Sequence, residues 1–407
     1  MSRPGLRREG VHHEWLGGGL GSGLGLAIIP SVDGLRQPVS LEGVLFGLAV
    51  YGGFIAVLFL LAKFLPGKRV LGQPLPNTDG QRRTYKINGM ALFVATHMLV
   101  FVGARFFGMS LTPLLRHFWS LLVAANLITL VWLGLMYRAG RKRLASAARA
   151  GEEDGETVGR GALARFWYGI ELNPEFLGVD LKVFAYQPSL IGLGVLNVAF
   201  GWAQYEQLGA LTPQMLAYQV FWWGYLFTHY WIEDNVLSMW DVIAEKFGFM
   251  LLWGDLVLVP FFYCIAGWWI LQNPIPMPLW QVGGIALLHI VGLWIFRESN
   301  AQKNRFKKDR NTLIWGKPAQ LLGGRLLISG WWGIGRKINY SGEIMVYSSF
   351  ALCAGFSSII PFLLPLWLCA LLPHRAWRDE QRCAAKYGDL WVEYTKIAKF
   401  RMIPFIY

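Results

Sequence analysis

The sequence predicts an all-α integral membrane protein, a polytopic bundle of about ten transmembrane helices. Of its 407 residues, 54% are hydrophobic and only 15% are charged, whereas a soluble domain carries about 25% charged residues. Twenty tryptophans and repeated apolar stretches of about 20 residues, the length that crosses a bilayer, indicate the same class. The net charge of +13 lies mostly in a few loops, which is typical of membrane topology. We therefore expect membrane lipids around the chain and no nucleic-acid partner.

Nine strong transmembrane helices are expected from the apolar stretches, and a weaker stretch would supply a tenth. The seven clearest stretches are about 42–65, 87–108, 117–137, 188–208, 213–232, 247–271 and 278–296. The stretch 343–372 is long enough for a hairpin of two more helices, bent near Pro361 and Pro365. The weaker stretch, about 14–32, is rich in glycine.

Basic residues lie in alternate loops, which predicts the orientation of the bundle. The loops 66–86, 138–187 and 297–320 are rich in Lys and Arg, whereas the connections "EQLGALTP" and "QNPIPMP" contain neither. By the positive-inside rule, the basic loops and the tail face the cytoplasm. We expect a multi-pass protein of the endoplasmic reticulum or of a bacterial inner membrane. The chain divides into a helix bundle, 1–372, and a C-terminal cytoplasmic-face segment, 373–407.

A polar stripe follows the last apolar stretch. Arg375, Asp379, Cys383 and Tyr387 recur at four-residue steps, so they share one face of a helix. A basic stripe beside a membrane usually contacts lipid headgroups, but headgroups do not require interleaved carboxylates. The stretch "SGWWGIGRKINYSGE" adds two tryptophans for stacking on a flat ring and two cations for phosphate oxygens. The stripe therefore predicts one wall of a groove for a charged ligand.

Titratable residues inside the expected helices are further candidates. Tyr225, His229 and Glu233 would share one face at four-residue steps, an arrangement suited to proton transfer. Asp255 stands in the apolar run "LLWGDLVLV", where a carboxylate is either functional or hydrogen-bonded within the bundle. The four cysteines form no CxxC pair, and no His/Cys cluster has zinc-ligand spacing. We predict no metal site, and a nucleotide site without the GxGxxG fingerprint must be built from helices.

Six ordered motifs cover the chain from the second loop to the tail. They are "GQPLPNTDGQRRTYKING" (72–89), "GIELNPEFLGVDLKVF" (169–184), "FGFMLLWGDLVLVPFFY" (247–263), "FRESNAQKNRF" (296–306), "GWWGIGRKINYSG" (330–342) and "HRAWRDEQRCAAKYGDLWVEY" (374–394). Together they resemble the sterol reductase family, which includes the delta-14 sterol reductases, the C-terminal domain of the lamin B receptor and 7-dehydrocholesterol reductase. The resemblance runs from about residue 42 to 407. It implies about ten transmembrane helices and NADPH-dependent reduction of a sterol carbon–carbon double bond.

The resemblance also implies the location of the site. NADPH would lie near the cytosolic face in a pocket completed by 373–407, and a sterol would enter the bundle from the bilayer without an obligate protein partner. The positions that match the cofactor pocket are Lys303, Lys307, Trp331, Arg336, Asn339, Tyr340, Arg375, Asp379, Cys383 and Tyr387. Because an isolated alkene is not polarised, protonation to a carbocation must precede hydride transfer. We expect Asp379 and Tyr394 to act as a coupled acid relay, with Tyr225 and Glu233 as the second choice.

Departures from the family pattern keep other functions open. Lys337 stands where the family often has His, and Thr228 where it has Asp. The delta-14 or delta-7 ring position is the expected site of reduction, and the delta-24(28) side-chain position is the alternative. The tail also resembles isoprenylcysteine-type methyltransferases, which bind S-adenosylmethionine. A non-catalytic sterol-binding protein is the third possibility.

Overall fold

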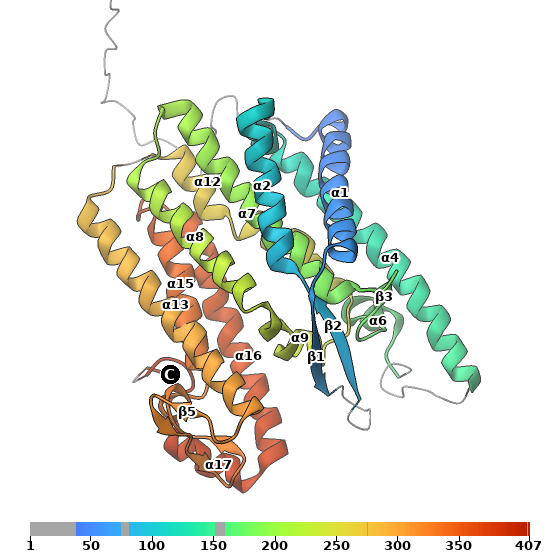
Figure 1. Ribbon diagram of the computed structural model, residues 1–407, viewed down its shortest axis with the longest axis vertical. Coiled ribbons are helices and arrows are strands. Elements are labelled where there is room, and N and C mark those ends of the chain that lie inside the picture. Colours follow the sequence, from blue (N-terminus) through green and yellow to red (C-terminus); the bar gives the residue numbers. More distant parts are fainter. Residues whose placement is uncertain (1–37, 75–80, 151–158, 275, 405) are drawn as a thin grey trace, which may run out of the picture. The chain divides into compact units, whose positions relative to one another are not determined.

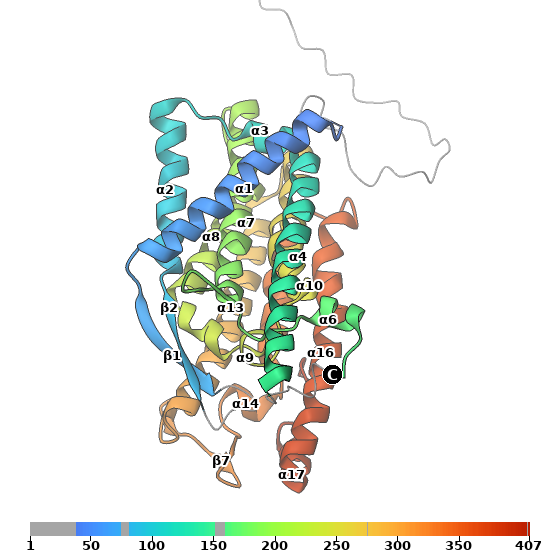
Figure 2. The ribbon, with the colours of Figure 1, turned by 90° about the vertical axis from the view of Figure 1, so that its right-hand side faces the viewer.

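Long helices that lie side by side form the protein (Figures 1 and 2). The computed structural model describes residues 38–407 except 75–80, 151–158, 275 and 405. The expected helix at 14–32 therefore lies outside the described residues. Within them, seven helical segments are long and apolar enough to cross a membrane: 41–64, 89–107, 118–149, 181–208, 249–272, 279–308 and 360–387. The prediction of an all-α polytopic membrane protein is confirmed.

The bounds of the elements follow in chain order. The first half contains α1 (Leu41–Phe64), β1 (Lys68–Pro74), β2 (Arg82–Ile87), α2 (Gly89–Phe107), α3 (Thr112–Arg116), α4 (Phe118–Ala150), α6 (Ala162–Tyr168), β3 (Glu175–Phe176), β4 (Val179–Asp180), α7 (Leu181–Leu208) and α8 (Pro213–Trp231). The middle contains η1 (Glu233–Ser238), α9 (Trp240–Ile243), α10 (Phe249–Trp253), η2 (Gly254–Leu258), α11 (Val259–Phe262), α12 (Ile265–Gln272) and α13 (Leu279–Lys308). The end contains β5 (Leu313–Ile314), β6 (Lys317–Pro318), β7 (Leu321–Leu322), β8 (Leu326–Leu327), α14 (Trp331–Ile334), α15 (Ile338–Leu352), η3 (Ile360–Phe362), α16 (Leu363–Tyr387) and α17 (Asp389–Ile397).

Capping residues explain where several of the long helices begin and end. The Ser40 hydroxyl accepts a hydrogen bond from the Gly43 amide at the start of α1. The Asp180 carboxylate caps α7 in the same way, and Thr212 caps α8 ahead of a proline at its first position. Such side chains satisfy amides that have no partner within the helix. Gly209 ends α7 in the left-handed conformation, which glycine adopts without steric cost.

The expected helix at 247–271 is interrupted rather than continuous. Its residues form α10, the π-helical turn η2, α11 and α12. Pro260 has no amide hydrogen, so it cannot donate to the carbonyl of Leu256 four residues earlier. The Tyr51 hydroxyl donates to that carbonyl instead, at 2.7 Å. Asp255 lies within the π-helical turn.

The stretch 343–372 forms parts of two helices, as the sequence predicts, but both extend further. The helix α15 begins at Ile338, inside the polar motif, and α16 continues to Tyr387. The division of the chain between 372 and 373 therefore falls inside a continuous helix. The polar stripe and the last apolar stretch belong to one helix, which contains Pro373.

The loop at 66–86 contains a β-hairpin that the sequence analysis did not anticipate. Strands β1 and β2 pair antiparallel with Val70 opposite Tyr85. The Tyr85 ring is buried with Val183, Val236 and Val242. The hairpin therefore packs against the start of α7 and the η1–α9 segment, at the end of the bundle that Figure 1 shows below the long helices.

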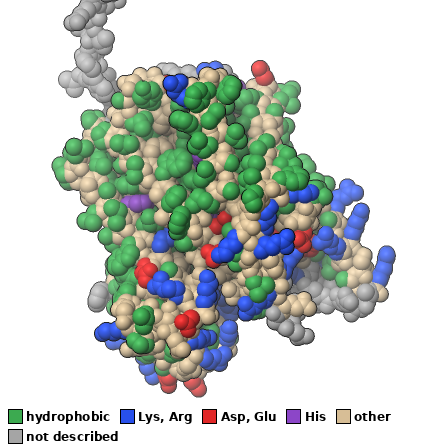
Figure 3. All heavy atoms as spheres, viewed as in Figure 1, with side chains coloured by type: hydrophobic (Ala, Val, Ile, Leu, Met, Phe, Trp, Pro, Cys, Tyr) green, Lys and Arg blue, Asp and Glu red, His purple; other side chains and the backbone are tan. Residues whose placement is uncertain are grey.

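Apolar and charged side chains separate along the bundle. Figure 3 shows hydrophobic side chains over the upper part of the face in view, whereas Lys and Arg gather below it. Many of the outward-facing residues of the long helices are large and hydrophobic, including Leu60, Val131 and Trp280. A lipid-facing surface requires this composition. We call the end that carries the β-hairpins, α14 and α17 the charged end.

Candidate active site

The polar stripe of α16 contacts the segment that leads into α15. The carboxylate of Asp379 forms an ion pair with Lys337 and a second one, at 2.6 Å, with Arg382. The Cys383 thiol lies 3.9 Å from the same carboxylate. These four residues, called the Asp379 cluster below, join two segments that are 42 residues apart in the sequence.

Two lysines of α13 add positive charge next to this cluster. Lys303 and Lys307 are four residues apart and share a helix face. The ammonium group of Lys303 lies 4.4 Å from the centre of the Trp332 ring, and it interacts electrostatically with Lys337 and Asp379. In the described part of the chain, neither Lys303 nor Lys307 has a carboxylate within ion-pair distance. The region therefore carries an excess of cations suited to an anionic ligand.

The two tryptophans of the "GWWG" motif are fixed to α13 by hydrogen bonds. The Trp331 amide donates to the Gln302 side-chain oxygen at 3.0 Å, and the Trp332 indole donates to the Ser299 carbonyl at 2.8 Å. Gly330 has φ = 63°, and a Cβ atom there would lie 2.3 Å from the Gln302 oxygen. Both observations require glycine at this position.

Arg336 has intramolecular partners in place of the phosphate contact that the sequence predicts. Its side chain is buried and pairs with Glu380 at 2.6 Å. It also donates to the carbonyl of Ala398 at 2.7 Å, and Arg401 pairs with the other Glu380 oxygen at 2.7 Å. Arg336 therefore ties α15, α16 and the C-terminal tail together, beside the Asp379 cluster.

Arg375 contacts a residue that the sequence analysis did not assign to the site. Its guanidinium donates to Asp241 of α9 at 3.0 Å. The buried Lys182 of α7 donates to the backbone carbonyls of Asp241, Val242 and Glu245 at 2.7–2.9 Å. Lys182 stands in the motif 169–184, whereas Asp241 lies outside the six motifs, so the motifs could have indicated only Lys182. Their pairing required the tertiary structure.

The remaining predicted cofactor residues differ in their surroundings. The Asn339 amide donates to Asn300 of α13 at 3.4 Å. Tyr340, one position further, interacts electrostatically with Arg375 and Lys337. Tyr387 packs against Trp391, with their ring centres 6.3 Å apart, beneath the guanidinium of Arg325. Tyr340 thus lies with the Asp379 cluster, Asn339 faces α13, and Tyr387 lies with α17.

The structure does not join Asp379 and Tyr394 as an acid relay. The Tyr394 hydroxyl donates to the Trp332 carbonyl at 2.9 Å, whereas Asp379 forms ion pairs with Lys337 and Arg382. No hydrogen bond links Asp379 to Tyr394 in the part of the chain that the structure describes. Burial raises the pKa of Tyr394, although Arg336 opposes this rise. Tyr394 therefore holds the tryptophan segment in place and is a weaker acid than a free tyrosine.

Tyr225 and Glu233 also occupy separate places, because α8 ends before Glu233. The Tyr347 hydroxyl donates to the Tyr225 hydroxyl at 3.3 Å. Glu233 instead accepts hydrogen bonds from the Gly89 amide at 2.7 Å and from Gln187 at 2.8 Å. Burial raises the pKa of Glu233, and these two hydrogen bonds oppose the rise. The prediction that Tyr225, His229 and Glu233 share one helix face is therefore wrong. Glu233 instead caps α2.

Tyr225 lies among aromatic rings deep in the bundle. Its ring contacts the Tyr347 ring at a centre-to-centre distance of 5.8 Å, and the Arg297 guanidinium lies 5.0 Å from its centre. Glu343 lies one turn before Tyr347 on α15 and interacts electrostatically with Arg375 and Arg297. Electrostatic interactions therefore extend from the polar stripe towards this aromatic cluster.

Several buried polar atoms at the charged end lack a partner in the described residues. They are the Trp331 indole nitrogen, the Asn339 side-chain oxygen and the Ser341 hydroxyl. Buried polar groups are normally hydrogen-bonded. A polar ligand between α14, α15 and α16 would provide such partners, so these residues fit a cofactor with phosphate and amide groups.

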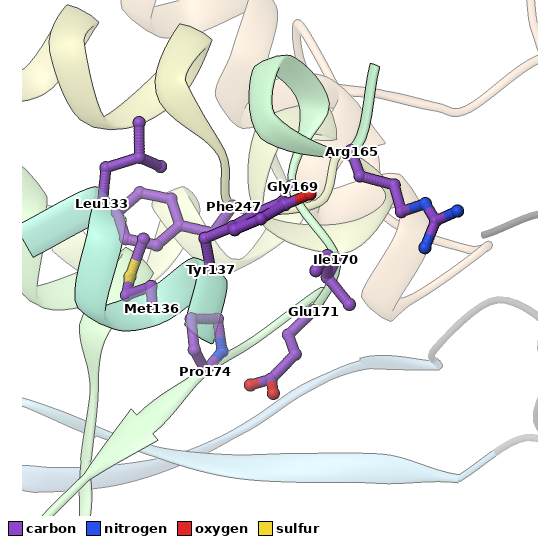
Figure 4. Close-up of a pocket in the computed structure, with 9 residues that line it drawn as sticks. All are labelled: Leu133, Met136, Tyr137, Arg165, Gly169, Ile170, Glu171, Pro174 and Phe247. Carbon is purple, nitrogen blue, oxygen red and sulfur yellow. The ribbon is translucent and has the colours of Figure 1, made fainter. Parts of the chain in front are cut away.

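A cavity beside the "ELNP" motif is too small for such a ligand. Its volume is about 20 Å³, which accommodates at most one water. Figure 4 shows the Glu171 carboxylate at its edge, directed away from the guanidinium of Arg165. Glu171 pairs with Arg143 at 2.8 Å. We assign this cavity a structural role.

The fold and the candidate site together define a helical membrane protein with a cation-rich region where its long helices leave the apolar region. Residues 40–407 match the profile of the family described as the ergosterol biosynthesis ERG4/ERG24 family. The chain belongs to this family of sterol reductases.

Curated relatives cover most of the chain. A Delta(14)-sterol reductase of Arabidopsis thaliana is 35% identical over 87% of this chain and 94% of its own length. A Delta(14)-sterol reductase of Methylotuvimicrobium alcaliphilum is 36% identical over 87% of this chain and 83% of its own length. A 7-dehydrocholesterol reductase of Xenopus laevis is 30% identical over 85% of this chain and 75% of its own length. The family profile, which matches residues 40–407, includes all six motifs.

Proposed function

We propose that this protein reduces a ring double bond of a sterol with NADPH as the hydride source, at the delta-14 position first and at delta-7 second. The observation that carries the proposal is the ion pair between Asp379 of the α16 stripe and Lys337 of the segment that leads into α15. It lies next to two lysines of α13 that have no ion-pair partner among the described residues. The names of the relatives favour delta-14 over the side-chain position. The charged end would face the cytoplasm, because Lys and Arg are concentrated there.

The proposed cofactor site uses groups of different chemistry. Lys303 and Lys307 would bind phosphate oxygens, and the exposed part of Trp331 would stack on a ring. Asn339 and Ser341 would meet amide or hydroxyl groups. When bound, NADPH supplies the hydride.

The residues of the chain must supply the proton. We propose Tyr225 as the donor, because its hydroxyl pairs with that of Tyr347 inside a cluster of aromatic rings. Aromatic faces attract cations, so the same cluster would stabilise the carbocation that protonation creates. Asp379 would hold Lys337 and Arg382 in position at the cofactor end. The proton donor and the cofactor site would then lie on opposite sides of the reacting double bond.

The direct test is incubation of the purified protein with NADPH and separate delta-14, delta-7 and delta-24(28) sterol substrates, with products identified by mass spectrometry. We expect reduction of the delta-14 substrate. The Asp379→Asn and Tyr225→Phe variants should each lose about 100-fold or more in turnover, the range for one group essential to proton transfer or charge stabilisation. Tyr225→Phe should still bind NADPH, and Tyr205→Phe, at an exposed position of α7, should retain full activity.

Two results would favour the alternatives. Calorimetric binding of S-adenosylmethionine without binding of NADPH would indicate a methyltransferase. Sterol binding without NADPH oxidation, for every substrate in the panel, would indicate a non-catalytic sterol-binding protein. Asp379→Asn turnover within a few-fold of wild type would overturn the assignment of that residue.

A further inference from the structure

A large groove lies between α2, α7 and α8 and extends from Phe93 and Phe227 to Arg105 and Leu111. Its volume is about 640 Å³, within the range of small-molecule sites. Its walls are Phe93, Val94, His97, Met98, Val100, Phe101, Ala104, Arg105, Leu111, Val198, Trp202, Trp223 and Phe227. Most of these side chains are apolar or aromatic, and the wall residues Phe101 and Phe227 are also exposed on the outer surface. A lipid therefore has direct access to the groove.

The groove is separate from the candidate active site. Trp223 and Phe227 line it from α8. Trp222 and Tyr225 of the same helix contact Phe350 of α15 instead, with centre-to-centre distances of 4.0 and 6.2 Å. The helix α8 therefore stands between the two regions, and the groove serves neither the proposed cofactor site nor the proposed proton donor.

Arg105 lines the groove, and Glu206 accepts a hydrogen bond from its wall residue Trp202; neither has an ionic partner in the described residues. Arg105, in the last turn of α2, is exposed and has no carboxylate within ion-pair distance in the described residues. Glu206, in the last turn of α7, accepts hydrogen bonds from the Trp202 indole and the Thr112 hydroxyl, both at 2.6 Å. No Lys or Arg of the described chain pairs with Glu206. A carboxylate at a helix C-terminus is disfavoured by the helix dipole, so a cation beside it would be stabilising.

We propose that this groove binds a zwitterionic phospholipid whose head carries a phosphate and a primary ammonium group. One acyl chain would lie along the aromatic walls, the phosphate would contact Arg105, and the ammonium would contact Glu206. A sterol has no charged group that could pair with Arg105 or Glu206. An anionic phospholipid without an amine has no cation that could pair with Glu206. The site goes beyond the proposed catalytic function and does not depend on it.

The test is native mass spectrometry of the delipidated protein after exposure to equal amounts of phosphatidylethanolamine, phosphatidylglycerol and cholesterol. We expect the wild type to retain phosphatidylethanolamine over the other two. Ala104→Phe fills the groove, and it should lower this retention about tenfold, as should Arg105→Gln through loss of a charge-assisted hydrogen bond. Glu206→Gln should remove the preference for phosphatidylethanolamine over phosphatidylglycerol. The matched control Ala49→Phe, at an exposed position of α1, should bind as the wild type does.

The competing outcomes are distinct. Equal retention by Ala104→Phe and wild type would show that the lipid binds elsewhere, and the proposal would fail. Cholesterol retention that Ala104→Phe abolishes would make the groove a sterol site. If Ala104→Phe does not fold, the exposed substitutions Arg105→Gln and Glu206→Gln decide the matter, and unchanged lipid preference in both would overturn the proposal.

Discussion

Glu233 shows how one buried carboxylate can cap a distant helix. Its two oxygens accept hydrogen bonds from the Gly89 amide at the start of α2 and from Gln187 of α7. A Cβ atom on Gly89 would lie 2.3 Å from the carboxylate, so the close approach requires glycine. Burial raises the pKa of Glu233 above the ordinary value of 4.5, and the hydrogen bonds from Gln187 and Gly89 oppose this.

The raised pKa predicts how stability depends on pH. A carboxyl group that is harder to ionise in the folded state destabilises the fold as the pH rises above about 4.5 and through its folded pKa. Glu233→Gln keeps an acceptor for Gly89, and its amide can donate to the Gln187 oxygen, which has no partner in the described residues. We expect this variant to melt at the same temperature as wild type near pH 4.5 and at a higher temperature at pH 7.

Thermal unfolding in detergent across this pH range measures the difference. Glu393→Gln, at an exposed position of α17, is the control and should follow the wild type at every pH. A Glu233→Gln variant whose melting temperature stays parallel to that of wild type would show that Glu233 ionises normally in the fold.

The motifs located the site residues without their pairings. Lys303, Asn339 and Asp379 were selected from the sequence, and the structure brings all three to the charged end. Arg336 and Tyr394 were also selected, but their hydrogen-bonding groups face Glu380 and Trp332. A linear pattern gives the residue type and the helix face. It does not give the partner, because the partner comes from another helix.

At the scale of elements, the short helix α9 depends on a lysine from α7. Its last carbonyls would lack partners, but the buried Lys182 donates to Asp241 and Val242 and also to Glu245. Asp241 in turn accepts from Arg375 of α16. Lys182 therefore fixes the segment that positions one end of the polar stripe.

Lys182→Met keeps the length of the side chain and removes all three donors. Each unpaired buried carbonyl costs about 1–3 kcal/mol, so we expect residues 239–247 to open locally while the long helices remain folded. Hydrogen exchange by mass spectrometry should show faster exchange in 239–247 alone, and the activity should fall with it. Lys142→Met, at an exposed position of α4, is the matched control. Unchanged protection of 239–247 would show that the segment does not need Lys182.

The apolar stretches predicted the membrane helices within a few residues in several cases, because the length of a span is set by the bilayer. The expected stretch 42–65 corresponds to α1, and 87–108 corresponds to α2. The β1–β2 hairpin was not predicted, since its strands carry many charges and bury little besides Tyr85. The start of α15 was placed too late, because its first turn lies inside a polar motif.

At the scale of the whole molecule, the chain end completes the charged end of the bundle. The amides of Arg336 and Lys337 donate to the carbonyls of Phe400 and Arg401 at 2.9 and 2.7 Å. Glu380 of α16 binds Arg336 and Arg401 together. The tail therefore braces the segment that carries Lys337, one member of the Asp379 cluster.

Arg336→Met should destabilise the packing of the tail without destabilising the helix bundle. Removing one partner of a buried ion pair costs about 3–5 kcal/mol, and here the loss falls on contacts with residues 398–401. We expect trypsin to cleave at Lys399 and Arg401 faster, and sterol reduction to fall about tenfold or more, because a cost of about 1.4 kcal/mol already corresponds to a factor of ten. The helical circular dichroism should change little, because the apolar helices do not rely on this pair.

Arg305→Met is the matched control, since Arg305 pairs with Glu298 at the surface, where an ion pair contributes about 0–1 kcal/mol. If both variants resist trypsin equally and retain full activity, the tail is held by its backbone contacts alone, and the Arg336 side chain is not needed for reduction.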